Sequence, residues 1–328
     1  MTDTGRMCVQ PLIDGRQMNV GACITGLDLK AGLDEPAREA LIRAWHEYGM
    51  LVFRDTGAGT EEQVALSKVF GNLEEHPTPE LWVDGNPYLI EISGRTMRRA
   101  FVFDDDKLLL GRLAWHRDTA FMLSVCRGAM LRLVDVPPED GETFFADTAA
   151  AYDALPDDIK ERIDGAEVQA TARFDVVKRT PGQFWNKARP ATMEEHDSTG
   201  AADEEEIAAR FPSVIHPLVI SHPETGRKCL YFSPWYLDHI LGWPKEESDE
   251  MLAMLDRHTT SEPFRYAHQW QAGDMVLWDN RRFLHAANGY NPKYTRTGFR
   301  TTLADPLLTG RYVDSNAAIK APARAYEV

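Results

Sequence analysis

The chain has 328 residues, with 36 basic and 51 acidic side chains and a formal net charge of −15. So acidic a surface is repelled by phosphate backbones, which argues against non-specific nucleic-acid binding. Hydrophobic residues make up 43% of the chain and charged residues 27%, a globular rather than a disordered composition. No window approaches the roughly eighteen uninterrupted apolar residues of a membrane helix, so we expect no membrane contact.

The first third of the chain predicts a mixture of helices and strands. Two short apolar runs predict strands at residues 20–24 and 50–53, and two periodic segments predict helices at residues 34–48 and 60–70. Gly49 is expected to close the first helix. Thr60 is the expected N-cap of the second, because Gln63 three residues later completes a capping box.

From residue 113 onward the pattern changes to short apolar runs separated by turn residues. The expected strands are 113–116, 126–134, 143–146, 167–174, 214–220, 229–232, 264–269, 275–278, 283–287 and 299–303. One helix is expected at residues 245–258. Many short strands in succession favour an antiparallel sandwich or barrel over a doubly wound parallel sheet.

Residues 178–212 have the composition of an insertion. Seven acids and no base lie between Glu194 and Glu206, which predicts a solvated surface excursion. Long excursions can also cover a site, so a role as a lid stays open. No composition break divides the chain, and we expect residues 1–328 to form a single domain.

The four cysteines, which are Cys8, Cys23, Cys126 and Cys229, are scattered and show no CxxC spacing. This usage predicts reduced thiols and a cytoplasmic protein. The first ten residues lack a basic segment followed by an apolar run, so no signal peptide is expected.

His116-Arg117-Asp118 is the sharpest local candidate for chemistry. In an extended strand, residues i and i+2 point to the same face, so His116 and Asp118 could reach one metal ion. An imidazole and a carboxylate suit a divalent first-row metal. The pattern alone is weak, because a surface pair is the usual reason for it. A third ligand must come from elsewhere, and His285 stands out among ten histidines by following Trp278-Asp279-Asn280-Arg281.

At this point the sequence resembles the taurine/2,4-D dioxygenase family of iron(II)- and 2-oxoglutarate-dependent oxygenases. The resemblance runs from the first expected strand to about Pro306, and Glu142 stands where the family pattern has a second glycine. The matching motifs, in order, are His116-x-Asp118, the segment Gly141 to Asp147, His216-Pro217, His222-Pro223, Trp278 to His285, and finally Arg296 and Arg300.

The resemblance implies a double-stranded β-helix, or jelly roll, with flanking helices. It implies iron(II) on His116, Asp118 and His285, with 2-oxoglutarate and O2 as co-substrates. The distal carboxylate of 2-oxoglutarate would meet Arg296, whose guanidinium fork suits a carboxylate, and the hydroxyl of Thr143.

Arg300 lies four residues after Arg296, which predicts the same strand face for both arginines. In taurine-oxidising members the matching arginine and a histidine aligned with His76 hold the substrate's anionic group. Arg300 and His76 are therefore expected to bind a small anionic organic substrate, which the enzyme hydroxylates, with subsequent cleavage as one outcome. The resemblance further implies a homo-dimer or homo-tetramer.

Three alternatives stay open from the residues. A desaturase or epimerase of natural-product biosynthesis is the nearest within the family. A non-catalytic cupin-like binding protein would be expected to lack a ligand or Arg296, and neither is missing. A zinc hydrolase could use the same three ligands but gives no role to Thr143 and Arg296 together.

Overall fold

The computed structural model describes residues 7–13, 20–76, 79–96, 100–103, 107–172, 188–192 and 210–314. The part of the expected insertion at 178–187 and 193–209 lies outside these residues, as does Phe174 at the end of one expected strand. The lid role of this segment therefore stays a prediction. Among the described residues, no helix combines the length and apolarity needed to cross a bilayer.

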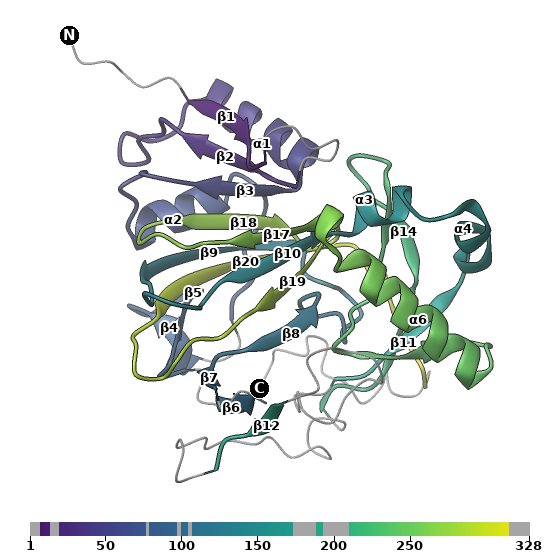
Figure 1. Ribbon diagram of the computed structural model, residues 1–328. Helices are drawn as coiled ribbons and strands as arrows, with labels where there is room; N and C mark the ends of the chain where they lie inside the picture. The colour runs from purple at the N-terminus through teal and green to yellow at the C-terminus, as the bar shows by residue number, and fades with distance from the viewer. Residues whose placement is uncertain are drawn as a thin grey trace.

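Two facing sheets form the centre of the fold (Figure 1). The larger sheet has the order β1 (Cys8–Pro11), β2 (Ala22–Thr25), β3 (Met50–Phe53), β18 (Met275–Asp279), β9 (Gly128–Asp135), β20 (Thr297–Leu303), β5 (Asn86–Ser93) and β4 (Trp82–Val83). The smaller sheet has the order β17 (Arg265–His268), β10 (Thr143–Asp147), β19 (Phe283–Ala287) and β8 (Leu113–His116). All these neighbours pair antiparallel except β2 and β3, which run parallel. This is the expected jelly roll.

Strand β18 shows how the sheets are held together. All five of its residues are buried, because the strand is covered on both faces. Met275 and Leu277 pack with the helices outside the larger sheet, whereas Val276 and Trp278 face the smaller sheet. This alternation follows from the two-residue period of a strand. The core between the sheets therefore extends to the strands that carry the candidate site.

Helices α1 (Glu35–Tyr48) and α2 (Thr60–Ser67) cover the outer face of the larger sheet. Asp34 caps α1 by accepting from the Ala37 N–H at 2.9 Å. The predicted cap of α2 was one residue late: Gly59 is the N-cap, and Glu62 accepts its N–H at 2.7 Å. Gln63 is instead buried, where its amide bonds two strand carbonyls.

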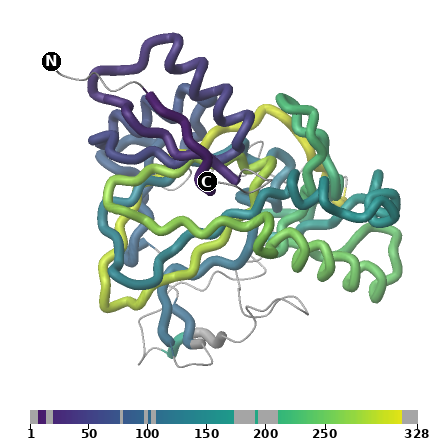
Figure 2. The backbone as a smooth tube through the Cα atoms, turned by 45° about the horizontal axis from the view of Figure 1, so that its top comes forward, coloured from purple at the N-terminus to yellow at the C-terminus, as the bar shows by residue number. Residues whose placement is uncertain are grey.

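The remaining helices lie to one side of the two sheets (Figure 2). In the part of the chain that the structure describes, they are α3 (Thr148–Asp153), α4 (Asp157–Ile163) and α6 (Lys245–Thr259), together with the short 3-10 turn Glu262–Phe264, whereas the 3-10 turn Pro79–Leu81 lies beside β5. The three helices and Glu262–Phe264 share a core with strands of a four-stranded sheet and a hairpin. The sheet is β16 (Leu237–Ile240), β11 (Glu167–Ala170), β13 (Val214–Pro217) and β21 (Arg311–Tyr312), and the hairpin is β14 (Val219–Ser221) and β15 (Lys228–Leu230).

Most expected strands are present, and those at 50–53, 113–116 and 283–287 match to the residue. The expected strand 214–220 is two strands, β13 and β14. It breaks at Leu218, whose N–H turns to bond the Ala166 carbonyl at 2.8 Å. Five described strands before β8 were not predicted: β1, β4, β5, β6 (Ala100–Phe103) and β7 (Leu108–Leu110). Strands β6 and β7 form a small sheet with β12 (Ala188–Pro190).

Candidate active site

The three predicted ligands meet on the smaller sheet. Strands β8 and β19 are antiparallel neighbours, and His116 lies directly opposite His285, with ring centroids 4.1 Å apart. Asp118 reaches both imidazoles, with 3.5 Å from His116 Nε2 to its Oδ1 and 3.5 Å from His285 Nε2 to its Oδ2. One ligand atom from each residue lies within 4.8 Å of the other two. All three residues are buried, so the cluster is closely packed and shielded.

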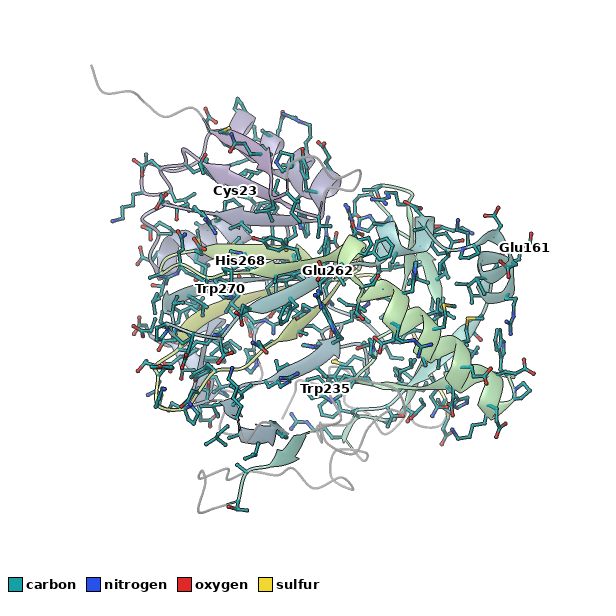
Figure 3. All side chains as sticks on the ribbon, viewed as in Figure 1. Cys23, Glu161, Trp235, Glu262, His268 and Trp270 are labelled. Atoms are coloured by element: carbon teal, nitrogen blue, oxygen red, sulfur yellow. The ribbon has the colours of Figure 1, made fainter. Side chains whose placement is uncertain are left out.

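The imidazoles are prepared to ligate. His116 Nδ1 lies 2.7 Å from the Ala114 carbonyl, which can only accept, so Nδ1 carries the proton and Nε2 offers its lone pair to the cluster. Burial, with neighbouring His116 as the next cause, holds the pKa of His285 well below its ordinary value. Trp235 packs edge-on against His116 at 5.3 Å (Figure 3). A neutral imidazole is the form that binds a metal ion.

Asp118 reaches the cluster differently from the prediction. Strand β8 ends at His116, and Asp118 begins a turn in which Thr119 has a φ of 55°. The two ligands are therefore not on one face of a continuous strand. Burial alone would raise the pKa of Asp118, but Arg300 and His285 outweigh it and hold that pKa below its ordinary value. The carboxylate is ionised and available to a cation.

Arg296 and Thr143, the residues expected to bind the co-substrate, are both buried. Thr143 begins β10, the neighbour of the His285 strand, and is buried. Arg296 is 8% exposed, and no described residue forms an ion pair or hydrogen bond with its guanidinium. Burial lowers the pKa of Arg296 to about 10. An unpaired buried cation is costly, so an anion bound beside Arg296 would be stabilising.

Gly141 forms a tight turn against Pro137, next to that arginine. Its φ of 80° favours glycine, and an added Cβ would lie 2.7 Å from Pro137 Cγ and 3.8 Å from Arg296 Cδ. The first glycine of the expected motif is thus required by the turn, whereas Glu142 at the second position bonds Asn288 at 2.8 Å.

Trp270 orients Thr143 and was not found from the sequence. Its indole Nε1–H donates to Thr143 Oγ1 at 3.0 Å. His268 packs edge-on against Trp270 at 4.5 Å, and Figure 3 shows the two side by side. Because the threonine oxygen accepts from Trp270, its own proton is free to donate to an anion. No sequence signal distinguishes this tryptophan from an ordinary core residue.

Arg300 lies beside the ligand cluster. It donates to Asp118 Oδ2 at 2.7 Å, and its guanidinium lies 5.6 Å from the centre of the Trp278 ring. Strand β20 begins at Thr297, so Arg300 lies within the strand and Arg296 directly precedes it. That the two arginines share a strand face stays a prediction.

His76 lies on the segment between α2 and β4. Its N–H donates to the Pro87 carbonyl at 2.8 Å, and its carbonyl accepts from the Trp82 indole at 2.9 Å. These bonds fix the backbone, while a substrate role for its imidazole stays a prediction. Glu74, two residues earlier, was missed: burial raises its pKa to about 7 despite the nearby Arg300.

A buried cluster of two histidines and one carboxylate in a jelly roll is the donor set of the mononuclear non-haem iron(II) oxygenases. Residues 12–302 match the model of the taurine catabolism dioxygenase TauD, TfdA family. The chain belongs to this family. It is therefore a 2-oxoglutarate-dependent dioxygenase that uses iron(II) and O2.

Named relatives and a solved structure are similar over nearly the whole chain. The (S)-phenoxypropionate/alpha-ketoglutarate-dioxygenase of Sphingobium herbicidovorans is 33% identical, over 87% of this chain and 92% of its own length. The alpha-ketoglutarate-dependent 2,4-dichlorophenoxyacetate dioxygenase of Cupriavidus pinatubonensis is 30% identical, over 87% and 94%. The crystal structure of AAD-2 with Mn(II) and N-oxalylglycine superposes with a TM-score of 0.69 at 26% identity, covering 93% of this chain and 99% of that chain.

Proposed function

We propose that this dioxygenase hydroxylates an aryloxyalkanoate at the carbon next to the ether oxygen. The observation that carries the proposal is a buried His116–Asp118–His285 cluster that has Arg300 in contact with its carboxylate. The class of substrate comes from the relatives named for phenoxypropionate and 2,4-dichlorophenoxyacetate. Both are aryl ethers with a carboxylate, an anion for which a guanidinium is a suitable partner.

The donor set fits iron(II). Two imidazole nitrogens and one carboxylate oxygen, from His116, His285 and Asp118, are the donor set that would hold iron(II) and leave it open to the co-substrates. When bound, iron(II) supplies the redox chemistry that activates O2 with 2-oxoglutarate as electron source. His116, fixed by the Ala114 carbonyl, and His285 hold the ion from adjacent strands, and Asp118 offsets its charge.

Arg296 and Thr143 are proposed to bind the distal carboxylate of 2-oxoglutarate. The guanidinium can give two parallel charge-assisted hydrogen bonds, and the Thr143 hydroxyl, already accepting from Trp270, can give a third. This contact also relieves the burial of an otherwise unpaired Arg296. Binding of 2-oxoglutarate should therefore favour the charged form of Arg296.

Arg300 and His76 are proposed to hold the carboxylate of the prime substrate. Trp235 packs against His116, and an aryl group of the substrate is proposed to contact this tryptophan. Hydroxylation at the ether carbon gives a hemiacetal or hemiketal, which breaks into a phenol and a 2-oxo acid. One oxygen atom of O2 enters this product, and the other enters succinate as CO2 leaves.

The first test is anaerobic. Adding iron(II) and then 2-oxoglutarate to the purified protein should give the weak visible charge-transfer band of the metal-bound 2-oxo acid. His116→Ala should abolish the band. Absence of the band in the wild-type protein, with no succinate formed in air, would show a binding protein or a metal-dependent enzyme of another kind.

The second test identifies the substrate. Aryloxyacetates, both enantiomers of aryloxypropionates, alkyl sulfates and taurine are compared for substrate-stimulated succinate release and, for the aryl ethers, phenol release. We expect an aryloxyalkanoate to give equal amounts of phenol and succinate. Preference for taurine or an alkyl sulfate would overturn the proposed substrate class. Oligomeric state is a separate proposal, a dimer or tetramer, which light scattering on the purified protein would measure.

A further inference from the structure

Asn280 lies in the turn between β18 and β19, five residues before His285, and is completely buried. Every polar group it has is in use. Its N–H donates to the Arg127 carbonyl at 2.8 Å, and its carbonyl accepts from the Arg117 guanidinium. Its side-chain Oδ1 accepts the Asp118 N–H at 3.0 Å. Its Nδ2 donates to the carbonyls of Asp118 at 3.0 Å and Cys126 at 2.9 Å.

The reciprocal bonds to Asp118 replace a missing strand. Because β8 ends at His116, no strand among the described residues pairs with the Asp118 backbone. The amide of Asn280 takes both the N–H and the C=O of Asp118, as a residue on a neighbouring strand would. The third bond, to Cys126, closes the turn from its far side, where the Cys126 N–H also donates to Thr119 Oγ1 at 2.8 Å.

Arg117 secures the other side of the ligand. Its guanidinium donates to the Asn280 carbonyl and, at 3.0 Å, to the Leu230 carbonyl of β15, while its N–H donates to Ser233 Oγ at 2.9 Å. The side chain is 1% exposed. Arg117, the residue before Asp118, is therefore itself bonded to Asn280, which restricts the backbone conformation of Asp118 further.

We propose that Asn280 is a positioning residue for the metal-binding carboxylate of Asp118. The proposal rests on the metal site of the proposed function. By binding the Asp118 main chain from a turn that leads directly into the His285 strand, Asn280 sets the separation of two ligands that are distant in the sequence. Without it, the carboxylate would be carried by an unpaired turn, and the three ligands would meet less often in the geometry that a metal ion needs.

The test measures metal affinity rather than activity. Asn280→Ala removes every side-chain hydrogen bond of Asn280 to Asp118 and Cys126. Asn280→Asp keeps the acceptor for the Asp118 N–H and loses the donor, and it provides a second variant if the alanine protein does not fold. Co(II) and Mn(II) are titrated by calorimetry into metal-free protein, and unfolding of the metal-free forms is followed by circular dichroism. We expect both variants to bind each metal about 10- to 100-fold more weakly than wild type.

Gln63→Ala is the matched control. Gln63 is equally buried, and its amide also bonds two strand carbonyls, those of Met130 and Phe299. This control should unfold at a lower temperature, as the Asn280 variants do, yet bind metal with wild-type affinity. A purely structural role for Asn280 would lower stability in the same way.

Folded Asn280 variants with wild-type affinity for both metals would overturn the proposal while leaving the metal site intact. A wild-type protein that binds neither metal, or a His116→Ala variant that binds them as well as wild type does, would overturn the proposed metal site and this role with it.

Discussion

Arg296→Met should make the metal-free protein more stable and the enzyme worse at binding its co-substrate. Burial lowers the pKa of Arg296 from 12.5 to about 10, which corresponds to a cost of ~3 kcal/mol for keeping the charge in place. Methionine retains an unbranched apolar stem and removes that charge. After some loss of packing we expect a gain of about 1–3 kcal/mol in the free energy of unfolding, seen as a rise of several degrees in Tm.

Binding should change in the opposite direction. A hydrogen bond between charged groups contributes about 1.5–3 kcal/mol, so losing two of them should weaken 2-oxoglutarate binding by ~100-fold or more. Thermal unfolding of the metal-free protein measures the first effect, and thermal unfolding in Mn(II), with and without 2-oxoglutarate, measures the second. Saturating 2-oxoglutarate should raise the Tm of the wild type by the linkage between binding and folding, and should leave the variant unchanged.

Two further proteins sharpen this experiment. Arg296→Lys keeps the charge without the planar fork and should bind 2-oxoglutarate with intermediate affinity. Arg43→Met replaces an arginine whose side chain is 69% exposed and should change neither quantity. An Arg296→Met protein that is less stable than wild type and still gains stability from 2-oxoglutarate would refute an anion site at this residue.

Three other predictions follow from named contacts. Trp270→Phe should raise the KM for 2-oxoglutarate about fivefold by removing the bond to Thr143, and should add nothing in a Thr143→Val background; a full additional loss there would refute the coupling. As pH rises from about 4.5 to about 7, the free energy of unfolding of metal-free Glu74→Gln, measured in urea, should increase relative to that of the wild type by up to ~3 kcal/mol. In that range the folded wild-type carboxyl stays protonated while the unfolded one ionises, so wild-type stability falls; parallel pH profiles would contradict this. Asp147→Asn should cost about 3–5 kcal/mol and lower the urea midpoint, because it leaves the buried Arg282 without its bidentate partner; an unchanged midpoint would show that the pair contributes nothing.

The ligands and much of the sheet were predictable because their signals are local or ordered along the chain. Strand β19 has a strong apolar pattern, and the motif from Trp278 to His285 identifies His285 from the sequence alone, without knowledge of which strands lie beside it. Strand β5 was missed because it mixes polar and apolar residues and is only partly buried, so its pairing with β20 is decided by tertiary contacts.

The contacts that prepare the site could not be predicted, because each joins residues far apart in the chain. Arg300 and Asp118 are 182 residues apart, and Trp270 reaches Thr143 across 127. The assumption that Asp118 continues the β8 strand failed for a related reason. The backbone N–H and C=O of a strand residue usually bond a neighbouring strand, whereas those of Asp118 bond the side-chain amide of Asn280. The alternation of polar and apolar residues along the sequence does not indicate this difference.

The position of His116 directly across from His285 has a consequence for how the protein resists unfolding. The two strands come from distant parts of the chain, and such non-local pairings form late and slowly during folding. A metal ion held by both imidazoles would therefore contribute little to the folding transition state and much to the native state. Metal should then slow the unfolding rate while leaving the folding rate nearly unchanged. In the cell, the metal-bound enzyme would resist degradation chiefly because it unfolds slowly.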